Sequence, residues 1–438
     1  MKQPENGRTI RIHEYEDLAY SDLKGGAARL EKTVSRLGVP VFRFYRNHAQ
    51  ASQYVGVVST GRDTIEILPK VHEGKDENLS YLISLLGYTR RLRLKSSGAA
   101  GFEKMRGSFL EVLIRHFATE LRRLLRTQHR LRYMDREDRT TFLRGKLLTE
   151  RELDGSGRLY VRYACRYEEF TPDHPLNRVL KYCNRLLSRQ TRVPATRKIL
   201  RENDALLSEV SGAAVSAATL DAIHLDRLNR DYEGILALCR LVLQSCALDL
   251  KSGHVEQLAY VFDMNKLFEE FVERFLTANM REIHVAGKPL VRVERQKKLG
   301  RLFDEFDMNV DLILHNDAGE RFLVDTKYKR LDRNKKHQGI SQSDFYQMHA
   351  YGTAGDRGYE NIVLLYPSTD PSIPISLRRT QLTSNLYVRQ FDVRGIFDPQ
   401  TGKTDNSFVI RQLNDALRLD YQDAKKEGVE ALPGSHHL

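Results

Sequence analysis

Two carboxylates and one ammonium group occur at a spacing that suits metal-dependent hydrolysis. Asp311 opens a short apolar run, and Asp325 and Lys327 end a second run that follows a turn at Asn316–Gly319. Two apolar runs around such a turn are typical of a β-hairpin. Side chains two residues apart in a strand share a face, so Asp325 and Lys327 should lie together, whereas Thr326 should face the other side.

The hairpin therefore predicts two carboxylates beside an ammonium group at a sheet edge. Carboxylate oxygens in such a place are suitable ligands for Mg²⁺, with Mn²⁺ as a substitute. A neighbouring lysine can position a water molecule or stabilise negative charge on a phosphate. A surface ion pair is the common alternative for such residues, and the hairpin alone does not decide between the two.

A helix with three glutamates is predicted before the hairpin. Asp263 should cap this helix, in which Glu269 and Glu273 share one stripe and Glu270 points elsewhere. Any of the three could lie near a bound cation or on a solvated acidic face. Further carboxylates close to the hairpin are alternative metal ligands: Asp304, Glu305 and Asp307.

A second helix is predicted after the hairpin and a basic loop at Tyr328–Lys336. Ser341 or Ser343 should cap this helix, which places Gln347 and Tyr351 one turn apart on the same face. A buried strand follows. The predicted order is thus helix, three strands, helix and strand, and it connects the glutamates, the hairpin and the Gln–Tyr pair in one domain.

The whole chain is predicted to be an α+β multidomain protein. Residues 1–76 alternate apolar and polar side chains and should form a β-rich domain, including a hairpin over 54–70. Residues 77–254 should form a mainly helical, basic middle region, and 255–425 the α/β domain that contains the hairpin. Residues 426–438 resemble a flexible tail. The basic middle region could contact phosphates or an acidic protein, and the two readings are equally open.

Composition restricts the class of protein further. The formal net charge is +12 and the pI about 9.4, which favours a polyanionic partner such as double-stranded DNA. The four cysteines are scattered without metal-binding spacing, and no apolar run is long enough for a membrane span. We therefore expect a cytoplasmic protein without membrane contact. No Gly-x-x-x-x-Gly-Lys-(Ser/Thr) loop is present, so the chain itself should bind no nucleotide.

These motifs together resemble the McrC family, the nuclease subunit of McrBC-type modification-dependent restriction systems. The order of elements and the Asp…Asp-x-Lys pattern resemble the αβββαβ core of PD-(D/E)XK restriction endonucleases. One departure is Val310, where many relatives have proline before the first aspartate. The resembling segments are Tyr54–Lys70, Arg144–Lys146, Glu169–Lys181, Met264–Glu269, Val310–Asp311, Val324–Lys329 and Asp344–Tyr351.

The resemblance implies a Mg²⁺-dependent endodeoxyribonuclease that docks on a ring of the AAA+ GTPase McrB, stimulates its nucleotide hydrolysis and cuts DNA near modified cytosines. The β-rich domain and the basic middle region are candidates for partner docking. Two alternatives remain, a non-catalytic activator of an AAA+ protein and a stand-alone repair nuclease. The implied roles are metal ligation by Asp311, Asp325 and Glu269, catalysis by Lys327, and support by Gln347 and Tyr351.

Overall fold

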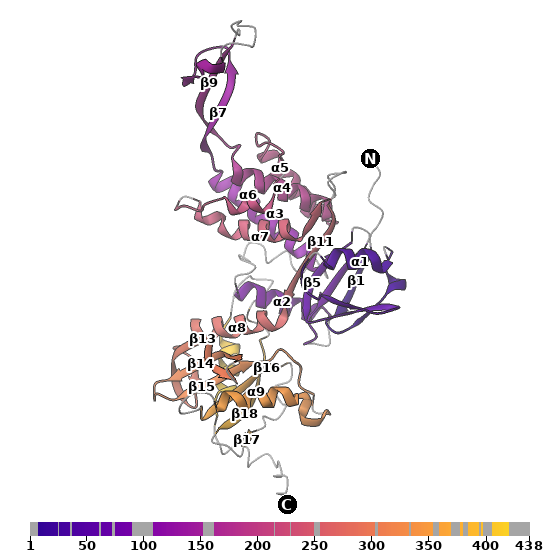
Figure 1. Cartoon of the computed structure of the whole chain (residues 1–438), viewed down its shortest axis with the longest axis vertical. Helices are drawn as coiled ribbons and strands as arrows, with labels where there is room; N and C mark the ends of the chain where they lie inside the picture. Colours follow the sequence, from indigo (N-terminus) through magenta and orange to yellow (C-terminus); the bar gives the residue numbers. More distant parts are fainter. Residues whose placement is uncertain are drawn as a thin grey trace, which may run out of the picture. The chain divides into compact units, whose positions relative to one another are not determined.

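The computed structural model divides the chain into two compact units (Figure 1). Unit 1 combines residues 1–107 with 261–438, and unit 2 consists of residues 108–260. The division differs from the predicted boundaries at 76 and 254. The structure describes residues 8–24, 26–35, 37–60, 63–71, 75–89, 108–151, 162–213, 215–227, 229–248, 255–302, 305–332, 334–353, 359–368, 377–379, 384–393, 396 and 405–419. The predicted tail at 426–438 lies outside these residues.

The N-terminal part of unit 1 contains a small sheet built on the predicted hairpin. β5 (Tyr54–Ser59) and β6 (Asp63–Leu68) pair antiparallel, and β1 (Arg8–His13) adds in parallel to β6. All residues of β6 are buried, so this strand is the centre of the N-terminal core. The remaining elements here are β2 (Asp17–Ala19), η1 (Tyr20–Asp22), α1 (Gly26–Ser35), β3 (Phe42–Phe44) and β4 (His48–Ala51).

Two helices join the N-terminal part of unit 1 to its C-terminal part. α2 (Lys75–Tyr88) packs on α8 (Met264–Ala278), where the Tyr88 ring lies 5.3 Å from that of Phe271 and 5.2 Å from that of Phe275. This packing explains why the segment after residue 76 belongs to unit 1 rather than to the middle region.

A seven-stranded sheet forms the C-terminal part of unit 1. Its order is β12-β13-β14-β15-β16-β18-β17. β13, β14 and β15 pair antiparallel, and β16 pairs in parallel with both β15 and β18. The strands are β12 (His284–Val285), β13 (Lys288–Leu302), β14 (Phe306–Asn316), β15 (Arg321–Thr326), β16 (Asn361–Pro367), β17 (Leu377–Arg379) and β18 (Asn385–Phe391).

Helices α8 and α9 (Gln342–Gly352) cover opposite faces of this sheet. Met348 of α9 packs into a core cluster with Val388 of β18. Phe271 of α8 instead stacks on Phe391 of the same strand. Because side chains alternate along a strand, residues 388 and 391 face opposite sides. The predicted order of helix, strands, helix and strand is observed, and η6 (Lys336–Gly339) and α10 (Ser407–Ala416) complete this part.

Unit 2 consists of a helical bundle and a small three-stranded sheet. The long helix α3 (Phe109–Gln128) packs against α5, and α4 packs against both α5 and α7. No helix in the described parts of the chain combines the length and apolar character needed to cross a bilayer. The other elements are α4 (Pro175–Gln190), α5 (Pro194–Leu206), α6 (Ala217–Asp221), η5 (Arg230–Tyr232), α7 (Glu233–Ser245), β10 (Cys246–Leu248) and β11 (Val255–Asp263).

An arm of β-structure extends from this bundle, as Figure 1 shows. β7 (Arg132–Thr140) and β9 (Tyr163–Thr171) pair antiparallel along their whole length, and β8 (Lys146–Leu147) joins β9, with η4 (Thr149–Arg151) next to it. The middle region, predicted over 77–254 to be mainly helical, therefore also contains this arm of strands. Most side chains of β7 are exposed or half-buried, so this strand lacks the alternation of apolar residues that would reveal it in a sequence.

The base of the arm is fixed by the segment that precedes α4. The side chain of His174 contacts the Arg130 carbonyl oxygen at 3.1 Å, and the Asn177 amide donates to the same oxygen at 2.9 Å. Arg178 forms two hydrogen bonds to the Asp173 carboxylate, at 2.7 and 3.0 Å. The polar residues at the start of α4 therefore connect the helical bundle to the base of the arm.

Candidate active site

Neighbouring strands bring the two predicted aspartates together. Leu312 pairs with Val324 in the antiparallel register of β14 and β15, which places Asp311 across from Asp325. Asp325 also pairs with Leu364 of the parallel strand β16. Because both flanking strands and the helices enclose β15, the Asp325 side chain is only 1% exposed. Asp311 is half-buried.

Burial gives the Asp325 carboxyl an unusual proton affinity. Its pKa is raised to about 7, first by burial and then by the charge of Asp311, whereas Lys327 lowers it. Lys327 Nζ lies 2.6 Å from Asp325 Oδ2, as expected for side chains on the same side of the strand. The ammonium group is thus the charged partner of this buried oxygen.

Thr326 takes part in the site, and the prediction that it faces away is wrong. Its backbone N–H and its hydroxyl both donate to Asp311 Oδ2, at 2.7 and 2.8 Å. β15 ends at this residue, so the alternation of a regular strand no longer determines where the side chain lies. Thr326 thereby fixes one oxygen of Asp311.

Helix α9 supplies the predicted supporting pair. Ser341 is its cap and forms a capping box with Asp344. Gln347 accepts a hydrogen bond from Lys327 Nζ at 3.0 Å and donates to the Tyr351 hydroxyl at 2.6 Å. The Tyr351 hydroxyl in turn donates to the Asn309 carbonyl oxygen at 2.6 Å. This chain of contacts runs from Lys327 to β14 and orients the ammonium group.

Of the three glutamates on α8, Glu269 is the one whose pKa is affected by the charge of Asp311. Burial raises its pKa, and the charge of Asp311 raises it further. Glu270 instead pairs with Arg274 at 2.9 Å, and Glu273 faces Arg295 at 3.7 Å.

The structure gives no support to the alternative ligands. Glu305 is exposed, Asp304 lies outside the described residues, and the backbone of Asp307 pairs with Arg301 toward the far end of the β13–β14 ladder.

The donor set fits a hard divalent cation. Asp311 and Asp325 offer carboxylate oxygens on neighbouring strands, and the buried Oδ2 of Asp325 has the Lys327 ammonium group as its charged partner. A cation between the two aspartates would offset their mutual repulsion. No three carboxylate, imidazole or thiol groups among the described residues are close enough to form a complete ligand set. Water and phosphate oxygens would therefore supply the remaining ligands, as they commonly do for Mg²⁺.

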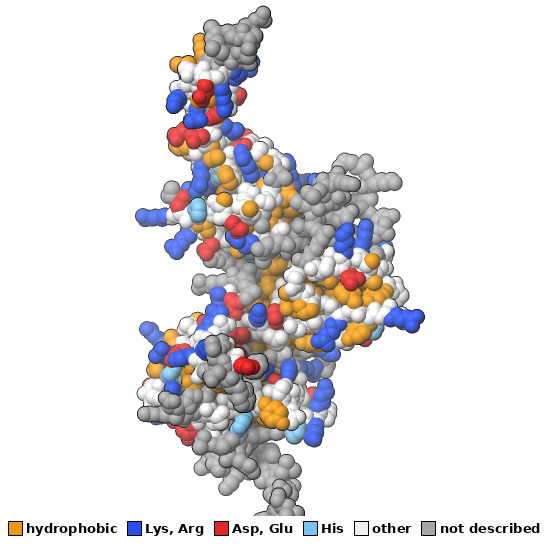
Figure 2. All heavy atoms as spheres, in the orientation of Figure 1, with side chains coloured by type: hydrophobic (Ala, Val, Ile, Leu, Met, Phe, Trp, Pro, Cys, Tyr) orange, Lys and Arg blue, Asp and Glu red, His pale blue; other side chains and the backbone are white. Residues whose placement is uncertain are grey.

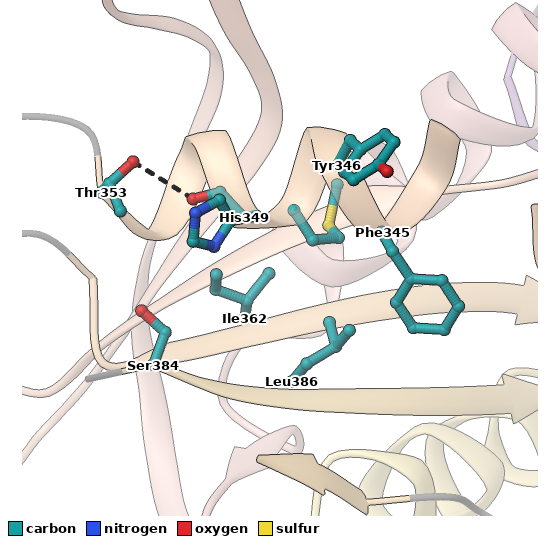
Figure 3. A pocket seen from close by; sticks show the side chains of 8 residues that line it. Phe345, Tyr346, His349, Thr353, Ile362, Ser384 and Leu386 are labelled. Atoms are coloured by element: carbon teal, nitrogen blue, oxygen red, sulfur yellow. Dashed lines mark hydrogen bonds between the residues drawn. The ribbon is translucent and has the colours of Figure 1, made fainter. Parts of the chain in front are cut away.

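A pocket on another side of α9 is separate from these carboxylates. Figure 3 shows Phe345 and His349 of α9 facing Ile362 and Leu386 of the sheet, and the enclosed space is about 220 Å³. None of the predicted site residues lines it. Its lining carries no carboxylate, so the pocket offers no acidic ligands for a hard cation.

Comparison with known proteins identifies the family. A sequence model described as the McrBC 5-methylcytosine restriction system component matches residues 49–367, which is most of the chain and includes the Asp311 and Asp325 positions. The chain belongs to this McrBC family. The family predicted from the sequence is thus confirmed. Among curated proteins, none matches.

Two solved structures share the fold of this McrBC family member. A chain of the half-complex of Thermococcus gammatolerans McrB AAA+ hexamers with bound McrC matches with a TM-score of 0.72 at 21% identity, covering 93% of this chain and 99% of that chain. A chain of the Thermococcus gammatolerans McrBC complex matches with a TM-score of 0.50 at 24% identity, covering 62% and 88%. At these identities the likeness concerns the fold.

Gln296 and Thr326 are contacts of the site that the sequence did not reveal. Gln296 Nε2 donates to Glu269 Oε1 at 3.0 Å from the neighbouring strand β13. No spacing rule links a glutamine in one strand to a glutamate in a preceding helix. The only sequence signal was that this strand lies next to the hairpin with Asp311 and Asp325, and that signal does not single out one residue.

Proposed function

We propose that this McrBC family member is the Mg²⁺-dependent endonuclease subunit of a modification-dependent restriction system, with a PD-(D/E)XK catalytic domain. The observation that carries the proposal is the juxtaposition of Asp311, Asp325 and Lys327. Asp325 is buried beside Asp311, and Lys327 Nζ lies 2.6 Å from it. A surface ion pair would be exposed and would have no reason to place a second carboxylate against the first.

Each side chain has a defined task in phosphodiester hydrolysis. Asp311 and Asp325 would hold Mg²⁺, which, when bound, polarises the scissile phosphate and lowers the pKa of a water ligand. Lys327 would position the attacking water or stabilise charge on the phosphate in the transition state. Gln347 accepts from Lys327 and so holds the ammonium group in place. Glu269 would orient a water ligand of the cation from α8.

Duplex DNA is the proposed substrate, and the basic loop after β15 is its proposed contact. Lys335 and Lys336 are exposed on a compact turn in which Gln338 N–H donates to the Lys335 carbonyl oxygen at 2.8 Å. Buried Leu331 and Ile340 anchor both ends of the loop in the sheet core. A fixed loop that follows Lys327 directly can bind phosphates close to the scissile bond.

The proposed partner is an AAA+ GTPase ring, and one of the structures that share the fold contains McrB AAA+ hexamers with bound McrC. The arm, formed by β7, β8 and β9, is the best-supported docking surface because several large apolar side chains are exposed on it. Tyr133 is 69% exposed and packs on Phe170, with 4.9 Å between ring centroids, and Phe142 is 62% exposed. On the face that Figure 2 shows, Lys and Arg side chains are spread over both units instead of gathering in one patch. Charge therefore selects no docking surface on this face.

A cleavage assay tests the proposal. Purified chain with Mg²⁺ and cytosine-methylated plasmid is incubated with and without the AAA+ partner and GTP, with Asp325→Ala in parallel. Cleavage that requires both the partner and Asp325 supports a restriction subunit. Cleavage without partner would indicate a stand-alone nuclease, and stimulated GTP hydrolysis without any cleavage would indicate a non-catalytic activator.

A further inference from the structure

The backbone of β13 is distorted at one residue beside the site. Gln296 has a φ of 42°, and among the described non-glycine residues with positive φ it is the one that lies within a strand. Its neighbours Arg295 and Lys297 pair with Leu312 and Val310, so Gln296 stands across from Asp311. A left-handed conformation is costly for a side chain larger than glycine, and such strain is often found at functional sites.

The distortion lets two consecutive side chains reach the same helix. Gln296 Nε2 donates to Glu269 Oε1 at 3.0 Å, and Arg295 lies 3.7 Å from Glu273. Consecutive side chains of a regular strand point to opposite faces. Glu269 and Glu273 lie one turn apart on α8, and the left-handed residue turns Gln296 toward the first of them. The strained backbone conformation of Gln296 therefore allows its side chain to form the hydrogen bond to Glu269.

We propose that Gln296 is a positioning residue that holds Glu269 toward the cation bound by Asp311. This inference rests on the proposed function. The Asp311 and Glu269 carboxylates repel each other, which would favour a Glu269 rotamer directed into solvent. A hydrogen bond from a neutral amide restrains one oxygen of Glu269 without neutralising its charge. A lysine or arginine in this place would instead compete with the cation for the carboxylate.

Calorimetric titration of the full-length protein with Mn²⁺, without DNA, tests the role independently of cleavage. Gln296→Gly keeps a residue that tolerates positive φ and removes the amide, so we expect its Mn²⁺ dissociation constant to rise about tenfold or more. Its thermal unfolding midpoint should not fall, because glycine relieves the backbone strain. Gln296→Asn also tolerates this conformation but is one methylene shorter, and it should bind Mn²⁺ as weakly as the glycine variant.

Arg292→Ala is the matched control, because it removes an exposed charge from the same strand, where Arg292 pairs with Glu294 at 3.3 Å, and it should leave Mn²⁺ binding unchanged. Wild-type affinity in both Gln296 variants would overturn the positioning role, and so would equal weakening by Arg292→Ala. If the wild type binds Mn²⁺ tightly and one of these outcomes is found, only the role of Gln296 is contradicted, and the proposed nuclease site still stands. A wild-type protein that binds no Mn²⁺ would overturn the metal site and the positioning role together.

Discussion

At the scale of single residues, Gln347 shows how the site controls its lysine. The Gln347 side chain accepts from Lys327, donates to Tyr351 and lies 3.4 Å from Asp325 Oδ1. An ammonium group next to a buried carboxylate could otherwise adopt several rotamers. The amide selects the one in which Nζ faces both Asp325 and the helix.

We expect Gln347→Leu to lower the rate of DNA cleavage about 10- to 100-fold, because Lys327 loses its orienting acceptor. Initial rates with the partner present would measure this, with circular dichroism to verify the fold. Gln342→Leu is the control, since Gln342 is exposed on the same helix and donates a hydrogen bond to the Tyr346 hydroxyl at 2.7 Å. Equal rates for the two variants would contradict the role of Gln347.

The residues that were predictable are those governed by regular strand and helix geometry. Asp325 and Lys327 share a face because a strand alternates, and Gln347 and Tyr351 meet because a helix has 3.6 residues per turn. Thr326 and Gln296 were not predictable because both lie where this regularity stops. Thr326 ends β15, and Gln296 has a positive φ. Local pattern rules carry no information about such positions.

At the scale of elements, the loop between β15 and α9 is the proposed phosphate contact. His337 and Gln338 both have positive φ, and the Asp332 N–H donates to the Gln338 carbonyl oxygen at 3.0 Å. Lys329 leaves the start of the loop to pair with Asp344 at 3.0 Å. The loop is therefore held at several points, and its exposed lysines have restricted positions.

The double variant Lys335→Ala/Lys336→Ala should weaken DNA binding in a salt-dependent way. The binding constant falls with salt, and each lost phosphate contact makes the slope of log K against log salt less steep by about 0.9. Loss of both contacts should therefore reduce the steepness by about 1.8. Fluorescence anisotropy in EDTA, where no cleavage occurs, would give this slope. Lys32→Ala on α1 provides a control for a lost exposed charge. An unchanged slope in the double variant would exclude the loop from the DNA interface.

Elements with a buried apolar pattern were predictable, whereas the arm was not. Alternation revealed the β5–β6 hairpin because its strands are buried, and periodicity revealed α8 and α9. The side chains on both faces of β7 are exposed or half-buried, so apolar residues do not alternate along its sequence. Its partner strand is also far away in the chain.

At the scale of the whole molecule, a buried carboxyl in unit 1, that of Glu14, lies near residues from both sequence segments of the unit. Glu14 follows β1, and its side chain accepts from the Lys70 N–H at 2.8 Å. Burial raises its pKa to about 7, and the nearby Tyr328 hydroxyl, one residue after Lys327, offsets this only in part. The observed boundary between residues 107 and 108, in place of the predicted one at residue 76, was not predictable, because local patterns do not show which helices pack together.

Glu14 should make the stability of the protein depend on pH. Its folded pKa lies above the ordinary value of 4.5, so its contribution is fully present below pH 4.5 and is lost as pH rises through about 7. A shift of this size corresponds to about 3 kcal/mol. In urea unfolding, the wild type should lose stability between pH 5 and 8 relative to Glu14→Gln. Parallel pH profiles of the two proteins would contradict this.

The most direct test of the central claim compares wild type with Asp325→Asn in the complete complex with the AAA+ partner, GTP, Mg²⁺ and modified DNA. Asparagine keeps the shape of the buried side chain and removes the charge that would bind the cation. We predict that cleavage falls more than about a thousandfold while stimulated GTP hydrolysis is retained. Cleavage at the wild-type rate by the Asp325→Asn protein would show that phosphodiester hydrolysis occurs elsewhere.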